Sequence, residues 1–153
     1  MLVRKRFVHS LYCDDVRNEI GGKTTIVGIY GNELNVSAPE NGDVVTLAKL
    51  CVAVTVQTPK EQPFLTLRLK LFKDDEVIQQ IEVPSKDLVE AAATTEENEQ
   101  KNFHTFTALF VAQPFPIASS FLLRVHAETE SEEIMASALK VNLLSVEAAQ
   151  TLQ

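Results

Sequence analysis

The chain has 153 residues, with 14 Lys and Arg against 21 Asp and Glu, which gives a formal net charge of −7 at pH 7. A chain of this length can bury about 70% of its unfolded surface, so residues 1–153 are expected to form a single domain without help from metals or disulfides. Nucleic acid and anionic membranes are disfavoured as partners, because both require clustered Lys and Arg. The one short basic cluster is Arg4-Lys5-Arg6.

No stretch approaches the roughly 18 apolar residues of a transmembrane helix, and residues 1–10 lack the apolar core of a secretory signal peptide. A cytoplasmic location is therefore expected. The two cysteines, Cys13 and Cys51, lie in strand-like runs and do not make a disulfide framework. We expect both to be reduced, buried side chains, because free Cys behaves as a small apolar residue.

Apolar residues on both sides of a period-two pattern predict an internal strand over 7–13. Asp14 or Asp15 is then expected to cap a single helical turn that ends at Gly21, with a plain turn as the alternative. The β-branched residues of 24–30 predict a second strand. Gly28 within it indicates a bulge or a close approach of another part of the chain.

The run Cys-Asp-Asp-Val-Arg, followed by Glu, Gly-Gly-Lys and Gly-Ile-Tyr-Gly, occupies residues 13 to 31. This stretch resembles the opening of a family of short, uncharacterised bacterial proteins of unknown function. The resemblance covers the N-terminal fifth of the chain. It implies a bacterial source and carries over no activity, cofactor or site residue.

In the middle of the chain, Pro, Asn and Gly predict a loop over 38–43. A long strand is expected from Thr46 to Gln57, with its even-numbered residues facing the core, and it ends at Pro59. Alternating Leu residues predict a strand over 65–71. With residues 77–83 this strand forms a hairpin about Asp74-Asp75.

The second half of the chain begins with a predicted helical segment, 86–93. Ser85 is expected to cap it, and Asp87 lies in its first turn, where a carboxylate interacts favourably with the helix dipole. The polar run 94–100 is expected to be a surface connection. Three strands follow in the prediction: 103–111, apolar on both faces, and then 121–127 and 135–143, which form a hairpin about the acidic tip 130–133. Residues 145–153 are expected to be a frayed or short helical tail.

About eight short strands, two hairpins and one short helical segment predict an all-β fold, an antiparallel β-sandwich of immunoglobulin-like type. A closed barrel is the alternative. The chain has no Trp. The buried Trp of antibody domains is therefore missing, and the prediction concerns architecture alone.

No catalytic pattern stands out. His9, His104 and His126 are scattered over predicted strands, and no Gly-x-Ser-x-Gly sequence occurs. No Cys or His pair has the spacing of a structural zinc site, and Gly21-Gly22-Lys23 lacks the flanking residues of a nucleotide loop. We therefore expect the protein to have no enzymatic activity and to bind no cofactor. An enzyme with an unrecognised active site is kept as a third hypothesis, after the two binding functions described below.

Calcium is the one metal that the composition keeps open, because hard cations bind several carboxylate oxygens together. Residues 14–19 and the predicted hairpin tip at 74–75 together provide enough oxygen ligands if these two loops converge. The candidate ligands are Asp14, Asp15, Glu19, Asp74 and Asp75. Two interpretations stand beside this one. The carboxylates are solvated turn residues, or Arg17 pairs with Asp14 or Asp15 and fixes the turn.

The leading functional hypothesis is a non-catalytic module that presents loops or a strand edge to a protein partner. The predicted strand 103–111 also suits self-association into a homo-oligomer, because unpaired strand edges recruit strands. The alternative hypothesis is a calcium- or ligand-dependent binding domain that uses the acidic corner of Asp14, Asp15 and Glu19.

Overall fold

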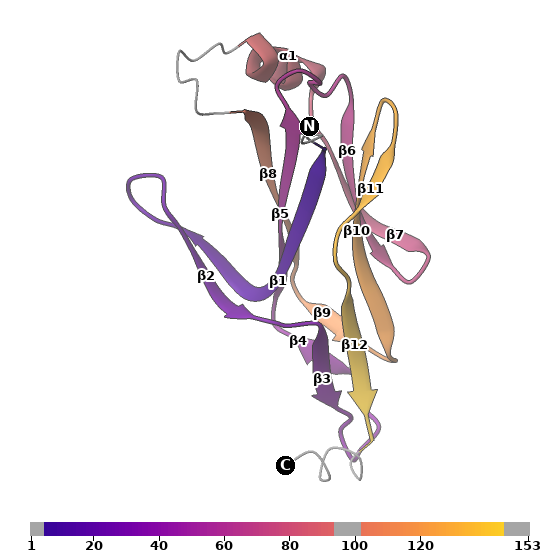
Figure 1. Cartoon of the computed structure of the whole chain (residues 1–153). Helices are drawn as coiled ribbons and strands as arrows, with labels where there is room; N and C mark the ends of the chain where they lie inside the picture. The colour runs from indigo at the N-terminus through magenta and orange to yellow at the C-terminus, as the bar shows by residue number, and fades with distance from the viewer. Residues whose placement is uncertain (1–4, 94–101, 146–153) are drawn as a thin grey trace. The chain divides into compact units, whose positions relative to one another are not determined.

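The computed structural model describes residues 5–93 and 102–145 of the chain (Figure 1). Within these residues lie twelve strands and one helix, so the all-β prediction is confirmed. The elements in chain order are β1 (Phe7–Asn18), β2 (Thr24–Ile29), β3 (Glu33–Ser37), β4 (Val45–Leu47), β5 (Leu50–Pro59), β6 (Leu67–Lys73), β7 (Glu76–Glu82), α1 (Ser85–Ala93), β8 (Phe103–Ala112), β9 (Phe115–Ile117), β10 (Phe121–Thr129), β11 (Glu133–Met135) and β12 (Leu139–Leu144).

The strands form two large sheets and a small ribbon. One sheet has the order β2-β1-β5-β8, and the other has the order β3-β12-β10-β6-β7, with β11 also paired to β10. Strands β4 and β9 make the ribbon. The two predicted hairpins are present, since β6 pairs antiparallel with β7 and β10 pairs antiparallel with β11 and β12. The expectation of purely antiparallel sheets is wrong for β3, which pairs parallel with β12.

Contacts divide the chain into two compact units. Unit 1 comprises Met1–Ser10, Val54–Ala108 and Arg124–Ser137, and unit 2 comprises Leu11–Ala53, Leu109–Leu123 and Ala138–Gln153. Strands β1, β5, β8 and β10 contribute residues to both.

Alternating apolar residues supply the core, as their period of two predicts. On β5 the predicted core-facing residues Leu50, Val52, Val54 and Val56 are buried, and on β6 and β10 the buried residues are Leu67, Leu69, Leu71, Phe121, Leu123, Val125 and Ala127. Leu65 departs from the prediction, because it lies before β6 begins and is 69% exposed. The alternation thus identifies the inner face but overextends the strand.

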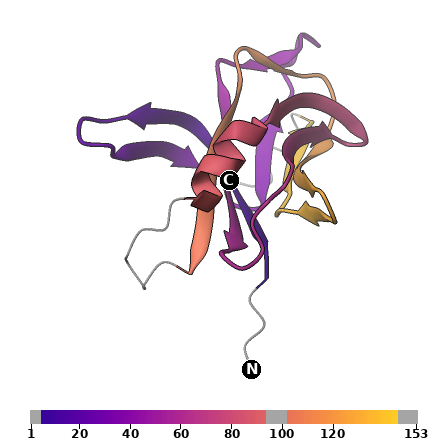
Figure 2. The same ribbon diagram turned by 90° about the horizontal axis from the view of Figure 1, so that it is seen from above.

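The N-terminal hairpin corrects the predicted helical turn. Strand β1 does not stop at Cys13 but continues to Asn18, and its last residues pair antiparallel with β2 (Figures 1 and 2). Asp14 and Asp15 are therefore strand residues, and the turn lies between Asn18 and Thr24. Two adjacent Asp residues are typical of a turn. Here hydrogen bonds to β2 satisfy the backbone N–H and C=O groups of this segment and keep the chain extended.

Two predicted strands are interrupted. The strand expected over 46–57 divides into β4 and β5, and β4 pairs with β9 in a separate ribbon. The strand expected over 135–143 divides into β11 and β12. The periodicity of one segment contains no information about a change of pairing partner, so neither break was predictable from the pattern. Pro116 lies within the short strand β9.

The helical prediction is confirmed by α1, which begins at Ser85, has Asp87 in its first turn and buries Leu88. Among the residues that the structure describes, no helix has the length and apolar character needed to cross a membrane. The predicted connection at 94–100 and residues 146–153 of the predicted tail lie outside the described residues.

Candidate interaction surface

Asp14 is engaged by the strand beside it. Its carboxylate lies directly against Gly28, where a Cβ atom would collide with it, and Gly28 has a φ of +65°. The Tyr30 hydroxyl donates a hydrogen bond to Asp14 Oδ1. Burial, followed by this bond and the charge of Asp14, raises the pKa of Tyr30. The sequence predicts a bulge or a close backbone approach at Gly28; what lies against it is the Asp14 side chain.

Asp15 belongs to a separate ionic group. Lys49 Nζ lies 2.6 Å from Asp15 Oδ1, and Arg17 Nε lies 3.1 Å from Oδ2. The hydrogen bond from Lys49, followed by that from Arg17, lowers the pKa of Asp15, and the same bond raises the pKa of Lys49. The Arg17 ion pair is thus confirmed with Asp15, in a strand instead of a turn, and both carboxylate oxygens already bind cationic side chains.

The remaining calcium candidates lie in turns. Glu19 follows β1, and its backbone N–H donates to the Lys23 carbonyl at 2.7 Å. At the β6–β7 turn, Arg124 donates to the Asp74 carbonyl at 2.6 Å and to the Asp75 carboxylate at 3.3 Å. In the described part of the chain, no three His, Cys, Asp or Glu side chains are grouped so that they could hold a metal ion.

The cysteines and histidines occupy strands. Cys13 and Cys51 are free and buried, as predicted, and Cys13 Sγ lies 3.8 Å from the Cys51 carbonyl oxygen. Burial, together with the charges of Cys51 and Asp14, raises the pKa of Cys13 to about 11, so the thiol is protonated at neutral pH. His126 Nδ1 lies 2.6 Å from Glu133 Oε1, while its Nε2 is buried and has no hydrogen-bond partner among the described residues.

Sequence reasoning missed the most connected charge in the described chain, Arg6. Its guanidinium donates to Thr58 and Thr129 at 3.1 Å each, pairs with Glu130 and lies 4.7 Å from the centre of the Phe64 ring. Further acceptors are the Ser131 hydroxyl and the carbonyls of Gln62 and Pro63. Every partner lies far along the chain, so no local pattern indicates this group.

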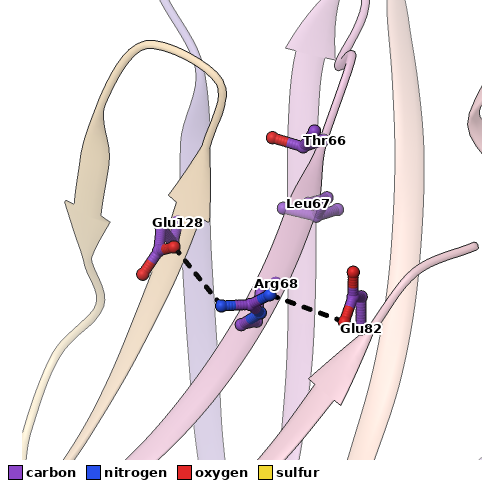
Figure 3. Close-up of a pocket in the computed structure, with 5 residues that line it drawn as sticks. All are labelled: Thr66, Leu67, Arg68, Glu82 and Glu128. Atoms are coloured by element: carbon purple, nitrogen blue, oxygen red, sulfur yellow. Dashed lines mark ion pairs between the residues drawn. The ribbon is translucent and has the colours of Figure 1, made fainter. Parts of the chain in front are cut away.

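Unit 1 also contains a small polar pocket of about 150 Å³, lined by Thr66, Leu67, Arg68, Glu82 and Glu128 (Figure 3). Arg68 lies between the two carboxylates, with nitrogen to oxygen distances of 3.5 Å to Glu82 and 3.7 Å to Glu128. Lys70 is closer to Glu128, at 2.6 Å, and its hydrogen bond lowers the pKa of that carboxyl. The opposite charges of Arg68, Glu82 and Glu128 compensate one another within this pocket.

A different surface lies on the outer side of the β2-β1-β5-β8 sheet in unit 2. Ile29 pairs with Cys13, so their side chains lie on the same side of the sheet. Cys51 lies on the side opposite the core-facing residues of β5, as does Gln57, which donates a hydrogen bond to Thr105 of β8. Alternation along β8 then places Leu109 and Val111 on this side as well.

The apolar face, as we name this surface, consists of Val27 and Ile29 on β2 and Leu109 and Val111 on β8, with the buried Cys13 and Cys51 on the strands between them. The four outer side chains are 38, 58, 39 and 38% exposed, in that order. The same side of the sheet in unit 1 carries the polar residues Thr55, Gln57, Thr105 and Thr107, together with the exposed Phe7. Asp15, which pairs with Val27, and its partner Lys49 lie beside these apolar side chains on the same side of the sheet.

The comparisons with known proteins leave the family open. No family model matches the chain, and no curated protein matches it. The resemblance of residues 13–31 to uncharacterised bacterial proteins accordingly stays a prediction, as does the bacterial source.

Proposed function

We propose that the protein is a non-catalytic interaction module, a largely antiparallel β-sandwich of immunoglobulin-like type that binds another protein through its apolar face. The observation that carries the proposal is the set of four exposed β-branched and Leu side chains on one side of a sheet. Exposed apolar groups that gather on one surface mark interaction sites more often than single ones do.

The sandwich architecture is supported by the burial pattern. Strands β6 and β10 of one sheet, and β5 of the other, each bury one row of alternating apolar residues. A sheet with one apolar face requires a second layer to cover it, and a sandwich provides that layer.

The non-catalytic role is supported by the state of the reactive side chains. The Cys13 thiol is protonated and buried, and the carboxylate of Asp15 is held by two cations. General acid–base and nucleophilic catalysis require a group that a substrate can reach, which the buried Cys13 thiol is not.

The test uses two doubly substituted proteins with the same added charge. The face variant is Ile29→Asp with Leu109→Asp, and the control is Val77→Asp with Val89→Asp, which changes two exposed apolar side chains of unit 1. All three proteins serve as bait in a lysate of the source organism. A retained protein is then purified, and its Kd for each bait is measured by calorimetry.

We expect a partner that binds the wild type and the control equally and the face variant about tenfold more weakly or worse, because buried carboxylates remain unpaired. Equal binding to all three baits, or the failure of every retained protein to bind after purification, would overturn the proposed face.

A further inference from the structure

Strand β8 is a sheet edge without charged residues. The order of its sheet ends at β8, which runs for 10 residues from Phe103 to Ala112 and contains no Lys, Arg, Asp or Glu. The ends of the other large sheet are charged, with Glu33 on β3 and both Glu76 and Glu82 on β7. Proteins commonly protect edge strands with charges, proline or bulges, because an unprotected edge pairs with other strands.

We propose that a second copy of this chain pairs its β8 antiparallel with this edge. The inference rests on the proposed interaction function and names the partner. A two-fold symmetric pair brings each strand against its own sequence, so any charge near the axis would face a like charge. The uncharged β8 meets this condition along 10 residues. The opposite edge of the same sheet, β2, is also uncharged but has only 6 residues, and a symmetric pair of β7 strands would place Glu76 opposite Glu82.

The register on the β5 side shows which backbone groups point outward. The backbone N–H of Lys60 donates to the carbonyl of Asn102 at 3.1 Å, and Gln57 bonds to Thr105. Both pairs fit one antiparallel register, in which even-numbered residues of β8 exchange hydrogen bonds with β5. The N–H and C=O groups of Phe103, Thr105, Thr107 and Leu109 therefore point away from β5, toward an added strand.

The geometry of a symmetric pair then fixes the contacts. We place the two-fold axis at Thr107, next to the midpoint of β8, so that Thr107 lies opposite its own counterpart and Thr105 lies opposite Leu109 of the second copy. Thr–Thr pairs across strands are favourable. The odd-numbered side chains of both copies share the outer side of the joined sheet, and Thr105 and Thr107 of both copies lie at the junction.

Charge favours edge pairing over stacking of whole faces. Each copy has a formal net charge of −7, so two copies repel, and an uncharged strand edge keeps the carboxylates of the two chains apart. Added salt screens this repulsion, and we therefore expect it to strengthen the dimer.

The test measures mass by sedimentation velocity over a wide range of protein concentration, against the 17.0 kDa of one chain. The variant is Thr107→Lys, which places two like charges at the axis. Its matched control is Thr55→Lys, because Thr55 lies opposite Thr107 on the neighbouring, non-edge strand β5. Circular dichroism and melting temperature verify that both variants fold.

We expect the wild type and Thr55→Lys to dimerise and Thr107→Lys to dimerise about tenfold more weakly or worse. Under mild oxidation, Thr107→Cys is expected to form a disulfide-linked dimer and Thr105→Cys is not, because only residue 107 meets its own copy. A wild type that is monomeric at every concentration overturns the inference, as does a dimer that Thr55→Lys weakens as much as Thr107→Lys.

The outcomes separate this inference from the proposed function. A monomeric protein that still binds a purified partner through the apolar face refutes self-pairing and supports the interaction function. A dimer that Ile29→Asp weakens and Thr107→Lys does not refutes pairing through the edge, and it too leaves the apolar face supported as the interface.

Discussion

Arg6 and Asp15 belong to two ionic groups associated with the same strand, β1, yet their surroundings differ sharply. The Arg6 side chain is 1% exposed and has six hydrogen-bonding partners in addition to the Phe64 ring. Asp15 and its partners Lys49 and Arg17 are 27, 32 and 65% exposed. Charged residues are clustered around Asp15 in the sequence, so the sequence draws attention to that residue. The structure shows that the more deeply buried charge is that of Arg6.

The difference teaches that the two groups have different energetic roles. An exposed pair gains little, because water and salt screen it and two side chains lose freedom. A buried guanidinium has lost its hydration and depends on every remaining partner. The Arg6 group therefore stabilises the fold only as a complete set, and the Asp15 group contributes to the outer surface of the hairpin.

Removing the buried guanidinium is expected to have the largest effect. Arg6→Met retains the side chain's volume but removes the guanidinium from Glu130, Thr58, Thr129 and two carbonyls, and it leaves the Glu130 charge without its cation; we expect a loss of about 3–5 kcal/mol in the free energy of unfolding. Urea denaturation followed by circular dichroism measures this loss.

Two further substitutions sharpen this comparison. Arg17→Met, in the exposed group, is expected to change stability by no more than about 0.5 kcal/mol. Arg6→Lys is expected to be intermediate, because an ammonium cannot reproduce the planar set of donors. Equal losses for Arg6→Met and Arg17→Met would contradict the distinction between the two groups.

The contact between Asp14 and Gly28 is expected to give the next largest effect. Gly28→Ala forces a residue with a Cβ into a φ of +65° and against the Asp14 carboxylate, at a cost of about 1–3 kcal/mol. Gly22 has a φ of +74° and nothing within 4 Å of its added Cβ. Gly22→Ala therefore measures the strain alone.

A double substitution separates the two contributions at this position. In an Asp14→Ala background the contacts with the carboxyl atoms are absent and only the Cβ contact at 3.1 Å remains, so the cost of Gly28→Ala should fall toward that of Gly22→Ala. A cost that is unchanged by Asp14→Ala, measured by the same denaturation experiment, would show that the close contact has no energetic weight.

The pH dependence of the Asp15 group is expected to be the smallest effect. The pKa of Asp15 lies below its ordinary value of 3.8 because of Lys49 and Arg17, so its contribution is present above that value and is lost as pH falls through the folded pKa. The melting temperature of Asp15→Asn should be slightly below that of the wild type at neutral pH.

The same melting curves recorded in acid test the sign of this effect. The difference between wild type and Asp15→Asn should shrink as pH falls below 3.8, and it should also shrink at high salt. A difference that grows in acid would contradict the assignment of Asp15 as the titrating partner of Lys49.

Local chemistry makes several features predictable. The alternation at Leu50–Val56 and Leu67–Leu71 identifies the buried faces, because side chains of a strand point alternately to its two sides. Ser85 and Asp87 indicate the start of α1, and Asp74-Asp75 indicates the turn between β6 and β7. Gly28 indicates a close approach, although the sequence does not say which side chain approaches.

The sequence by itself thus determined the β-rich class, most inner faces and the uncharged character of the segment that forms β8. Only the tertiary structure decided that this segment lies at a sheet edge, that Asp14 and Asp15 lie in a strand, and that Arg6 is buried. The physical reason is the distance along the sequence over which each interaction acts. Side-chain alternation and capping act between neighbours, whereas the hydrogen-bonding side chains that hold Arg6 lie 52 to 125 residues away.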